Sequence, residues 1–285
     1  MPIPRVLALL LSALLLCLCL PKPTSALPRI VPLYAAFTEI LVALDCQDAL
    51  VARTQTDTQP SLASLPVIGT HMQPNLERLV ALKPDIVLQL AGRSLAHAQA
   101  ERLRSLGIRV EELDLATFSD IFAVTERLGA LLGRKDKASA LVDGWKKRLH
   151  EAKALRPKKT YRLFFEVRYP GLLAAGRDNI VNSIIALSGG VNVVGHPKKL
   201  VRLGEETVFA LDPDVYVVQK GPMNPNPLPF ADRPGFDRLA AIAKGHTLLV
   251  REELFSRPGP ASIEAVMTLS TYLHALEVSE SEAKR

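Results

Sequence analysis

The chain has 285 residues and a net charge of +6, from 35 basic and 29 acidic side chains. This excess of positive charge is small and spread along the chain, which argues against a nucleic-acid-binding protein, whose basic residues gather on one face. With 48% hydrophobic residues, a chain of this length can bury one or two sizeable cores, and its fold is predicted to rest on them.

The first 26 residues have the pattern of a cleaved secretory signal peptide. Residues 1–5 are a short basic start, 6–20 an almost unbroken apolar run, and 21–26 end in small residues. The apolar run is shorter than the roughly 20 residues that a membrane-spanning helix needs, and a retained N-terminal anchor is the alternative. Cys17 and Cys19 lack the small preceding residue of a lipidated cysteine, so a soluble exported product is predicted, not a lipoprotein.

After residue 26, short apolar runs alternate with segments of helical composition. The predicted strands are 29–34, 86–90, 110–113, 162–167, 215–218 and 248–250. The predicted helices are 38–44, an alanine-rich helix ending at 106, 121–132, 134–156, 179–187 and 236–243. This alternation predicts parallel sheets joined by helical crossovers, which is an α/β fold.

Two segments that lie 129 residues apart are similar. Residues 75–88 read NLERLVALKPDIVL and residues 204–217 read GEETVFALDPDVYV, so that Glu77 aligns with Glu206 and Asp85 with Asp214. Each copy predicts a short helix that stops at X-Pro-Asp, followed by a buried strand. Chance similarity is the alternative, but seven ungapped matches favour an internal duplication. The chain is therefore predicted to form two similar α/β lobes.

Residues 134–156 are charged, rich in helix formers and followed by Pro157. Leu141, Trp145, Leu149 and Ala152 recur at helical spacing, which predicts one long amphipathic helix. At about 1.5 Å per residue it would span roughly 34 Å, enough to cross between the lobes. A single stiff connection of this kind predicts a cleft that closes only slightly.

The predicted organisation has four parts. They are a signal peptide (1–26), an N-terminal lobe (27–133), an interlobe backbone helix (134–157) and a C-terminal lobe (158–285).

Four segments, together with the linking helix, carry a resemblance to a known family. They are 29–44 (RIVPLYAAFTEILVAL), 67–88 (VIGTHMQPNLERLVALKPDIVL), 106–110 (LGIRV) and 257–260 (RPGP). With them the chain resembles the helical-backbone, class III solute-binding proteins of ABC importers for ferric siderophores, haem and cobalamin. The resemblance implies two lobes, each a mainly parallel sheet with flanking helices, joined by one long helix with the ligand cleft between them.

The resemblance also implies a role and partners. It implies a monomeric periplasmic protein, without an intrinsic cofactor, that delivers a metal chelate to a permease and its ATPase in the inner membrane. In the family, one acidic residue at the tip of each lobe pairs with arginines of the permease, and Glu77 and Glu206 are similar to these acids. The helix dipole alone also favours a glutamate in the first turn, and Glu205 is the neighbour that could dock instead.

Ligand contacts are predicted from the rule that ligands of open parallel sheets lie beyond the carboxyl ends of the strands. The candidates are Tyr34, His71, Met72, Arg93, Arg168, Tyr169 and Lys220, to which the resemblance adds Glu253 and Arg257. The four basic residues among them would make a cationic cleft suited to carboxylates, catecholates or propionates.

His71 and Met72 lie where haem-binding members of the family carry a tyrosine ligand to iron, at this position or next to it. Imidazole and thioether both suit the axial position of a haem iron or a cobalt, so His71 is the candidate metal ligand. A loop histidine without a ligand role is the alternative. His71 and Leu90 also stand where the family's corrinoid pockets carry tryptophans, which favours haem or a ferric siderophore over a corrinoid.

An enzyme is the alternative class, namely a two-lobed chelatase acting on a tetrapyrrole with His71 and Glu253. The sequence contains no G-x-S-x-G elbow, P-loop or H-E-x-x-H motif, and its six histidines are scattered. The signal peptide and the paired glutamates favour a carrier.

Overall fold

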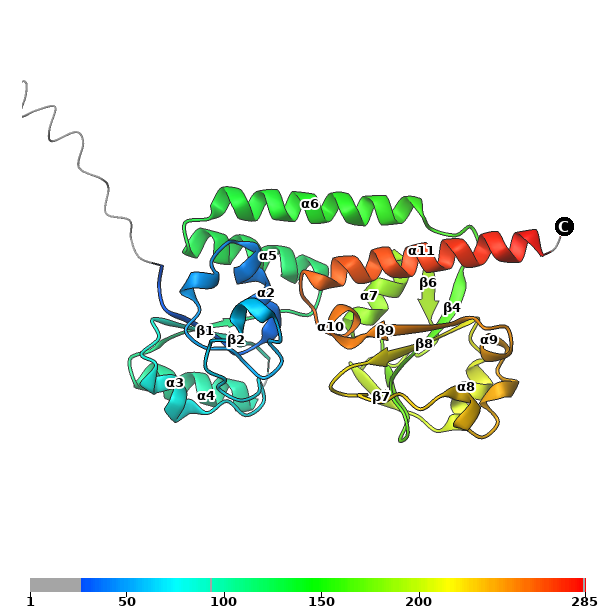
Figure 1. Cartoon of the computed structure of the whole chain (residues 1–285), viewed down its shortest axis with the longest axis horizontal. Helices are drawn as coiled ribbons and strands as arrows, with labels where there is room; N and C mark the ends of the chain where they lie inside the picture. Colours follow the sequence, from blue (N-terminus) through cyan, green and yellow to red (C-terminus); the bar gives the residue numbers. More distant parts are fainter. Residues whose placement is uncertain (1–26, 93, 284) are drawn as a thin grey trace, which may run out of the picture.

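The structure is a computed structural model that describes residues 27–92, 94–283 and 285. The predicted signal peptide and Arg93 therefore lie outside the described residues. Figure 1 shows two α/β lobes side by side, with the long helices α6 (Lys135–Ala154) and α11 (Ala261–Glu282) along one side of the molecule. Within the described part of the chain, no helix is long and apolar enough to cross a membrane.

The N-terminal lobe is built on a three-stranded parallel sheet. Its strands, in spatial order, are β1 (Ile30–Pro32), β2 (Ile86–Leu90) and β3 (Arg109–Leu113). Its helices are α2 (Ala35–Ala43), α3 (Leu76–Ala81), α4 (Ser94–Ser105) and α5 (Phe118–Leu131), with the short 3-10 turns η1 (Gln47–Ala49) and η2 (Pro60–Leu62). The apolar side chains of β2 are buried on both faces, as expected of a parallel strand covered by helices.

The C-terminal lobe repeats this plan and adds short strands. Its strands are β4 (Tyr161–Arg168), β5 (Leu173–Ala175), β6 (Gly190–Asn192), β7 (Leu200–Arg202), β8 (Val215–Lys220) and β9 (Thr247–Arg251). They are ordered β7-β5-β4-β8-β9, with β6 also paired to β4; β4, β8 and β9 are parallel, whereas β5 pairs antiparallel with both of its neighbours. Its helices are α7 (Ile180–Leu187), α8 (Glu205–Leu211), α9 (Ala240–Ala243) and α10 (Glu252–Phe255), with η3 (Phe230–Asp232) and η4 (Phe236–Arg238).

The helix predicted over 236–243 is wrong as a single element. It is divided into η4 and α9 at Leu239, whose backbone is extended (φ −67°, ψ 128°) and whose side chain is buried in the core of the lobe. Leu239 is therefore buried with an extended backbone, at a position where the local periodicity alone predicts a helix.

The internal duplication appears as the same set of hydrogen bonds in both lobes. The Asp85 carboxylate accepts a hydrogen bond from the backbone N–H of Arg29 at 2.7 Å, and that of Asp214 accepts one from Arg162 at 2.8 Å. Each arginine side chain also donates to a backbone carbonyl at the end of the short helix that precedes the aspartate. These carbonyls belong to Leu82 and Leu211, at 2.8 and 2.6 Å. The prediction of two similar lobes is confirmed, because each lobe joins its helix to its first strand in the same way.

The long helix α6 connects the lobes by packing on α5 and α11. Trp145 stacks on Phe122 of α5 with ring centroids 6.5 Å apart, and Arg148 forms an ion pair with Glu264 of α11. One hydrophobic cluster also runs through both lobes, from Phe37 of α2 to residues of β4 and α11. This shared core favours small relative motion of the lobes.

Candidate functional site

A cavity of about 310 Å³ lies between the lobes. Six parallel strands (β1, β2, β3, β4, β8 and β9) end beside it, since its walls include residues at or just after their carboxyl ends. These residues are Tyr34, Leu90, Leu115, Val167, Pro222 and Glu252. The cavity therefore occupies the position where open parallel sheets bind ligands.

Tyr34 and His71 face each other on the N-terminal wall. Tyr34 follows β1 and is the N-cap residue of α2. Its ring lies edge-on to the imidazole of His71, with centroids 5.5 Å apart and an interplanar angle of 66°. The wall thus presents an imidazole and a phenol together, and both groups are known metal ligands.

The loop that carries His71 is closed by tight backbone contacts. Gly69 pairs with Pro74 and has a φ of 98°, and a Cβ atom there would lie 2.6 Å from the carbonyl oxygen of Gln73. Asn75 then caps α3 by accepting a hydrogen bond from the N–H of Arg78 at 2.9 Å. Only glycine fits at residue 69, so the turn that leads into His71 depends on this glycine.

Arg257 lies on the opposite wall and reaches across to the N-terminal lobe. Its Nη1 atom is 2.9 Å from Oε1 of Glu39 on α2, and the two side chains are only 17% and 16% exposed. Gly259 packs so closely on α2 that a Cβ atom would lie 3.0 Å from both Ala36 and Glu39. The two lobes therefore meet directly at this point. Sequence reasoning missed Glu39, although an acid within the apolar helix AAFTEILVA was a signal.

A second cavity of about 690 Å³ is lined by both members of this ion pair. It shares Thr56, Pro222 and Arg257 with the first cavity, and Glu39 and Glu253 line it. Burial raises the pKa of the Glu39 carboxyl above its ordinary value, and the attraction of Arg257 offsets this only in part. The predicted ligand residue Glu253 thus borders the second cavity.

The proline-rich loop 221–229 forms one edge of the first cavity and has no regular structure, as its composition predicts. Met223 lines the cavity, and its backbone N–H donates to Oε2 of Glu252 at 2.8 Å. Burial raises the pKa of Glu252, against the effects of this hydrogen bond and of the positive charge on Arg257. Glu252, which sequence reasoning missed, therefore anchors the loop at the cavity edge.

Three other predicted ligand residues line neither of the two cavities. Met72 is 47% exposed beside His71, and Arg168 and Lys220 end β4 and β8 without lining either cavity. Among the described residues, the first cavity is instead lined by two basic side chains, Lys199 and Arg257, and by acidic ones. Of the four basic residues predicted to make the cleft cationic, Arg257 lines the cavity, Arg168 and Lys220 do not, and Arg93 lies outside the described residues.

Tyr169 is buried, which corrects its prediction as a cleft residue. Its ring packs in the core of the C-terminal lobe, its hydroxyl is 2.7 Å from Oε1 of Glu205, and the guanidinium of Arg233 lies 4.4 Å from its centroid. The β4–β5 register shifts between Glu166 and Arg168, which interrupts the alternation of the strand just before Tyr169.

Lys199 and Asp178 are cavity residues that sequence reasoning missed. They lie in the segments between β5 and β7, and these strands of three residues each are too short to give a clear periodic signal. Gly176 lets the two segments touch, because a Cβ atom there would lie 2.2 Å from the carbonyl oxygen of Lys198.

Glu77 and Glu206 are exposed in the first turns of α3 and α8. Figure 1 shows these helices on the side of the molecule opposite to α6 and α11, one in each lobe. Glu205 is half-buried, and its carboxylate accepts the hydrogen bond from Tyr169. Glu206 is therefore the better match to Glu77 in exposure.

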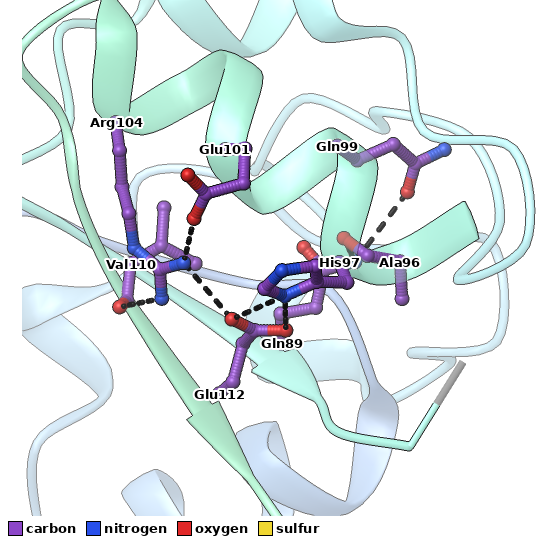
Figure 2. A network of polar contacts seen from close by, with 8 residues as sticks. All are labelled: Gln89, Ala96, His97, Gln99, Glu101, Arg104, Val110 and Glu112. Atoms are coloured by element: carbon purple, nitrogen blue, oxygen red, sulfur yellow. Dashed lines mark hydrogen bonds and ion pairs between the residues drawn. The ribbon is translucent and has the colours of Figure 1, made fainter. Parts of the chain in front are cut away.

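A polar network holds α4 on the N-terminal sheet (Figure 2). Gln89 of β2 donates to the carbonyl oxygen of Ala96 at 2.9 Å. Arg104 lies 2.9 Å from the Glu112 carboxylate of β3, and Nδ1 of His97 lies 3.2 Å from it. These contacts join α4 to β2 and β3. In the described chain there is no group of three or more His, Cys, Asp or Glu residues that could hold a metal ion.

Residues 30–254 match the family described as periplasmic binding protein. The chain belongs to this family. A vitamin B12-binding protein of Salmonella typhimurium is 30% identical to it over 208 residues, which cover 71% of this chain and 76% of the relative. The uncharacterized ABC transporter substrate-binding lipoprotein YvrC of Bacillus subtilis is 28% identical over 254 residues, covering 86% and 80%.

Solved structures of periplasmic binding proteins share the fold. The haem-binding protein RhuT of Roseiflexus sp. RS-1 in its apo form has a TM-score of 0.77 at 22% identity, over 88% of this chain and all of that one. The vitamin B12-binding protein BtuF of Vibrio cholerae has a TM-score of 0.73 at 22% identity, over 87% and 97%. The predicted resemblance to class III binding proteins and the predicted fold class are confirmed.

Proposed function

We propose that this periplasmic binding protein is the substrate-binding component of an ABC importer and that it carries haem, with His71 as an axial ligand to the iron. The observation that carries the proposal is the imidazole of His71 on the wall of the interlobe cavity, edge-on to Tyr34. A neutral imidazole is a common protein ligand of haem iron. Apolar side chains on the opposite wall, Leu200 and Met223 among them, suit the face of a macrocycle.

The polar groups of the cavity agree with this cargo. Lys199 and Arg257 provide cations for the two propionates, and Arg257 is held in place by Glu39. The relatives named above are binding proteins, which supports a carrier and gives no support to the chelatase alternative.

A corrinoid is the second candidate cargo. The observation in its favour is the 30% identity to a protein named as vitamin B12-binding, and the cobalt of a corrinoid also accepts an imidazole ligand. Ferric siderophores form the third class, for which metal ligation by His71 is unnecessary.

The test is a visible absorption titration of the mature chain with ferric haem, a cobalamin and a panel of ferric siderophores. We expect saturable haem binding with a shifted Soret band that His71→Ala abolishes. His97→Ala is the matched control, because His97 contacts Glu112 away from the cavity. Tyr34→Phe separates the two rings: it keeps the wild-type Soret position if the imidazole is the ligand and changes it if the phenolate is. Binding of a siderophore or cobalamin alone would overturn the haem assignment.

We further propose that Glu77 and Glu206 dock the protein on cationic side chains of the permease. Their placement on one face, in matching turns of the two lobes, supports this role. Exposed ion pairs contribute about 0.2–1 kcal/mol each, so Glu77→Gln and Glu206→Gln are each expected to weaken docking only a few-fold. Cargo affinity should stay unchanged in both variants.

The protein is proposed to act in the periplasm after export. The mass of the mature chain purified from its own cells tests this. Cleavage after residue 26 gives a chain beginning at Leu27, whereas a lipidated chain would begin at Cys17 or Cys19.

A further inference from the structure

An open groove of about 370 Å³ lies between α3 and α4, and Glu77 is one of the residues that line it. Figure 1 shows both helices on the side of the molecule opposite to α6 and α11. Its lining is apolar, with Val80 of α3, Leu103 of α4 and Leu106 among the residues that form it, and Glu77 and Arg102 stand at its charged edge. Leu103 is fully buried, whereas Leu106 is 57% exposed. An apolar pocket with a charged rim is the usual form of an anchor site in a protein interface.

The other lobe fills the equivalent space with its own side chains. The position of Val80 in the internal repeat is taken by Phe209, whose ring packs edge-on to Phe236 at 5.7 Å between centroids. Leu106 and Gly107 (φ 79°) form the turn from α4 to β3, and Lys244 and Gly245 (φ 70°) form the corresponding turn from α9 to β9. Lys244 is therefore the counterpart of Leu106 in the other lobe. Only the N-terminal lobe therefore combines a small residue on the short helix with an apolar side chain at the rim.

The two helices that form the groove, α3 and α4, are held in place by hydrogen bonds and an ion pair outside the groove. Arg104 bonds to Glu112 and to the carbonyl oxygen of Val110, which fastens α4 to β3 (Figure 2). Asn75 caps the first turn of α3. Because both helices are anchored outside the groove, the space between them does not depend on a partner to form.

We propose that this groove is a socket for one apolar side chain of the importer's permease, next to the permease cation that pairs with Glu77. The inference rests on the proposed importer function. Glu77 and Val80 are three residues apart on one helix, so their Cβ atoms lie about 5–6 Å apart and the two permease side chains must be close neighbours. The occupant is therefore a periplasmic loop that carries an arginine or lysine beside an aliphatic or aromatic residue.

The socket makes docking unequal in the two lobes. Glu206 offers charge alone, whereas Glu77 offers charge together with an apolar pocket. Burial of an apolar side chain is worth more than an exposed ion pair, so the N-terminal lobe is expected to contribute the larger share of affinity.

The test measures binding of the mature protein to the importer's permease–ATPase complex in lipid nanodiscs by surface plasmon resonance. Val80→Phe introduces the residue that the other lobe has at this position, Phe209, so that its ring fills the groove. This variant is expected to weaken binding roughly tenfold or more. Leu106→Lys introduces a lysine, the residue type that the other lobe has at Lys244. It is expected to weaken binding as well, and to leave the fold intact because Leu106 is exposed. Val278→Phe on α11 is the matched control, expected to bind like the wild type.

The outcomes separate the socket from the docking proposal. Wild-type affinity for both Val80→Phe and Leu106→Lys would overturn the socket, and a loss in Glu77→Gln in the same experiment would keep the docking role. Wild-type affinity for all three variants would overturn docking through this face as well. Unchanged cargo titration and thermal unfolding of each variant confirm that the site and the fold are intact.

Discussion

Lys83 and Asp212 occupy the same position in the two lobes and share a left-handed backbone conformation, with φ of 48° and 38°. Each ends a short helix directly before a Pro-Asp pair, and the aspartate then bonds to the first strand of its lobe. Left-handed backbone costs roughly 1 kcal/mol for a residue with a Cβ atom. Its presence in both lobes indicates that the turn is imposed by the contacts around it.

We expect Lys83→Gly to stabilise the protein by about 0.5–1 kcal/mol, because glycine adopts this conformation without strain. Urea unfolding measures the change. Lys244→Gly is the control, since its φ of −89° suits any residue and no gain is expected there. A Lys83→Gly variant that is less stable than the wild type would contradict the assignment of strain.

The buried ion pair between Arg233 and Glu166 should be essential to the C-terminal lobe. Both side chains are almost fully buried, with Nη1 2.6 Å from Oε2, and the Tyr216 hydroxyl donates to the same oxygen. Arg233→Met leaves a buried carboxylate without its cation and is expected to cost about 3–5 kcal/mol in thermal or urea unfolding. Arg238→Met, at an exposed arginine, should change stability by less than about 0.5 kcal/mol.

The raised pKa of Glu39 predicts a pH dependence with a definite sign. Burial disfavours its carboxylate, so the folded protein holds this proton more tightly than the unfolded chain does. The contribution of Glu39 to stability is therefore fully present below the ordinary carboxyl pKa of 4.5 and is lost as the pH rises through the raised value.

Glu39→Gln isolates this effect. The free energy of unfolding of the wild type minus that of the variant should fall as the pH rises from about 4 to 7, measured by urea unfolding. A difference that grows with pH would show that the ion pair with Arg257 outweighs burial.

Gly259 is predicted to control the direct contact between the lobes. A methyl group there would come within 3.0 Å of Ala36 and Glu39, so Gly259→Ala must displace α2 or the loop. The expected loss is about 1–3 kcal/mol in thermal unfolding, typical of overpacking. Gly144→Ala on α6 is the control: nothing lies within 4 Å of its added carbon, and a gain of about 0.5–1 kcal/mol is expected.

Local patterns predict the two-lobed α/β architecture and part of the site, although not every helix: α11 is absent from the predicted elements. The repeat that pairs Asp85 with Asp214, and the apolar stripe through Trp145, are properties of neighbouring residues, and the structure has both as expected. The strand-end rule needs only the order of strands and loops, and it predicts His71 beside the cavity, where the structure places it.

Only the tertiary structure decided which side chains meet across long stretches of chain. Glu39 and Arg257 are 218 residues apart, and their pairing depends on how the two lobes pack. Tyr169 follows a strand as His71 follows its own, yet a shift in strand register and the buried Arg233 place it in the core. The groove beside Val80 is open, whereas Phe209 at the matching position of the other lobe packs against Phe236. The sequence shows this difference as a substitution, and only the packing shows that it leaves a groove. Periodicity along the chain encodes which face of an element is buried, whereas the partner on that face is decided by the whole fold.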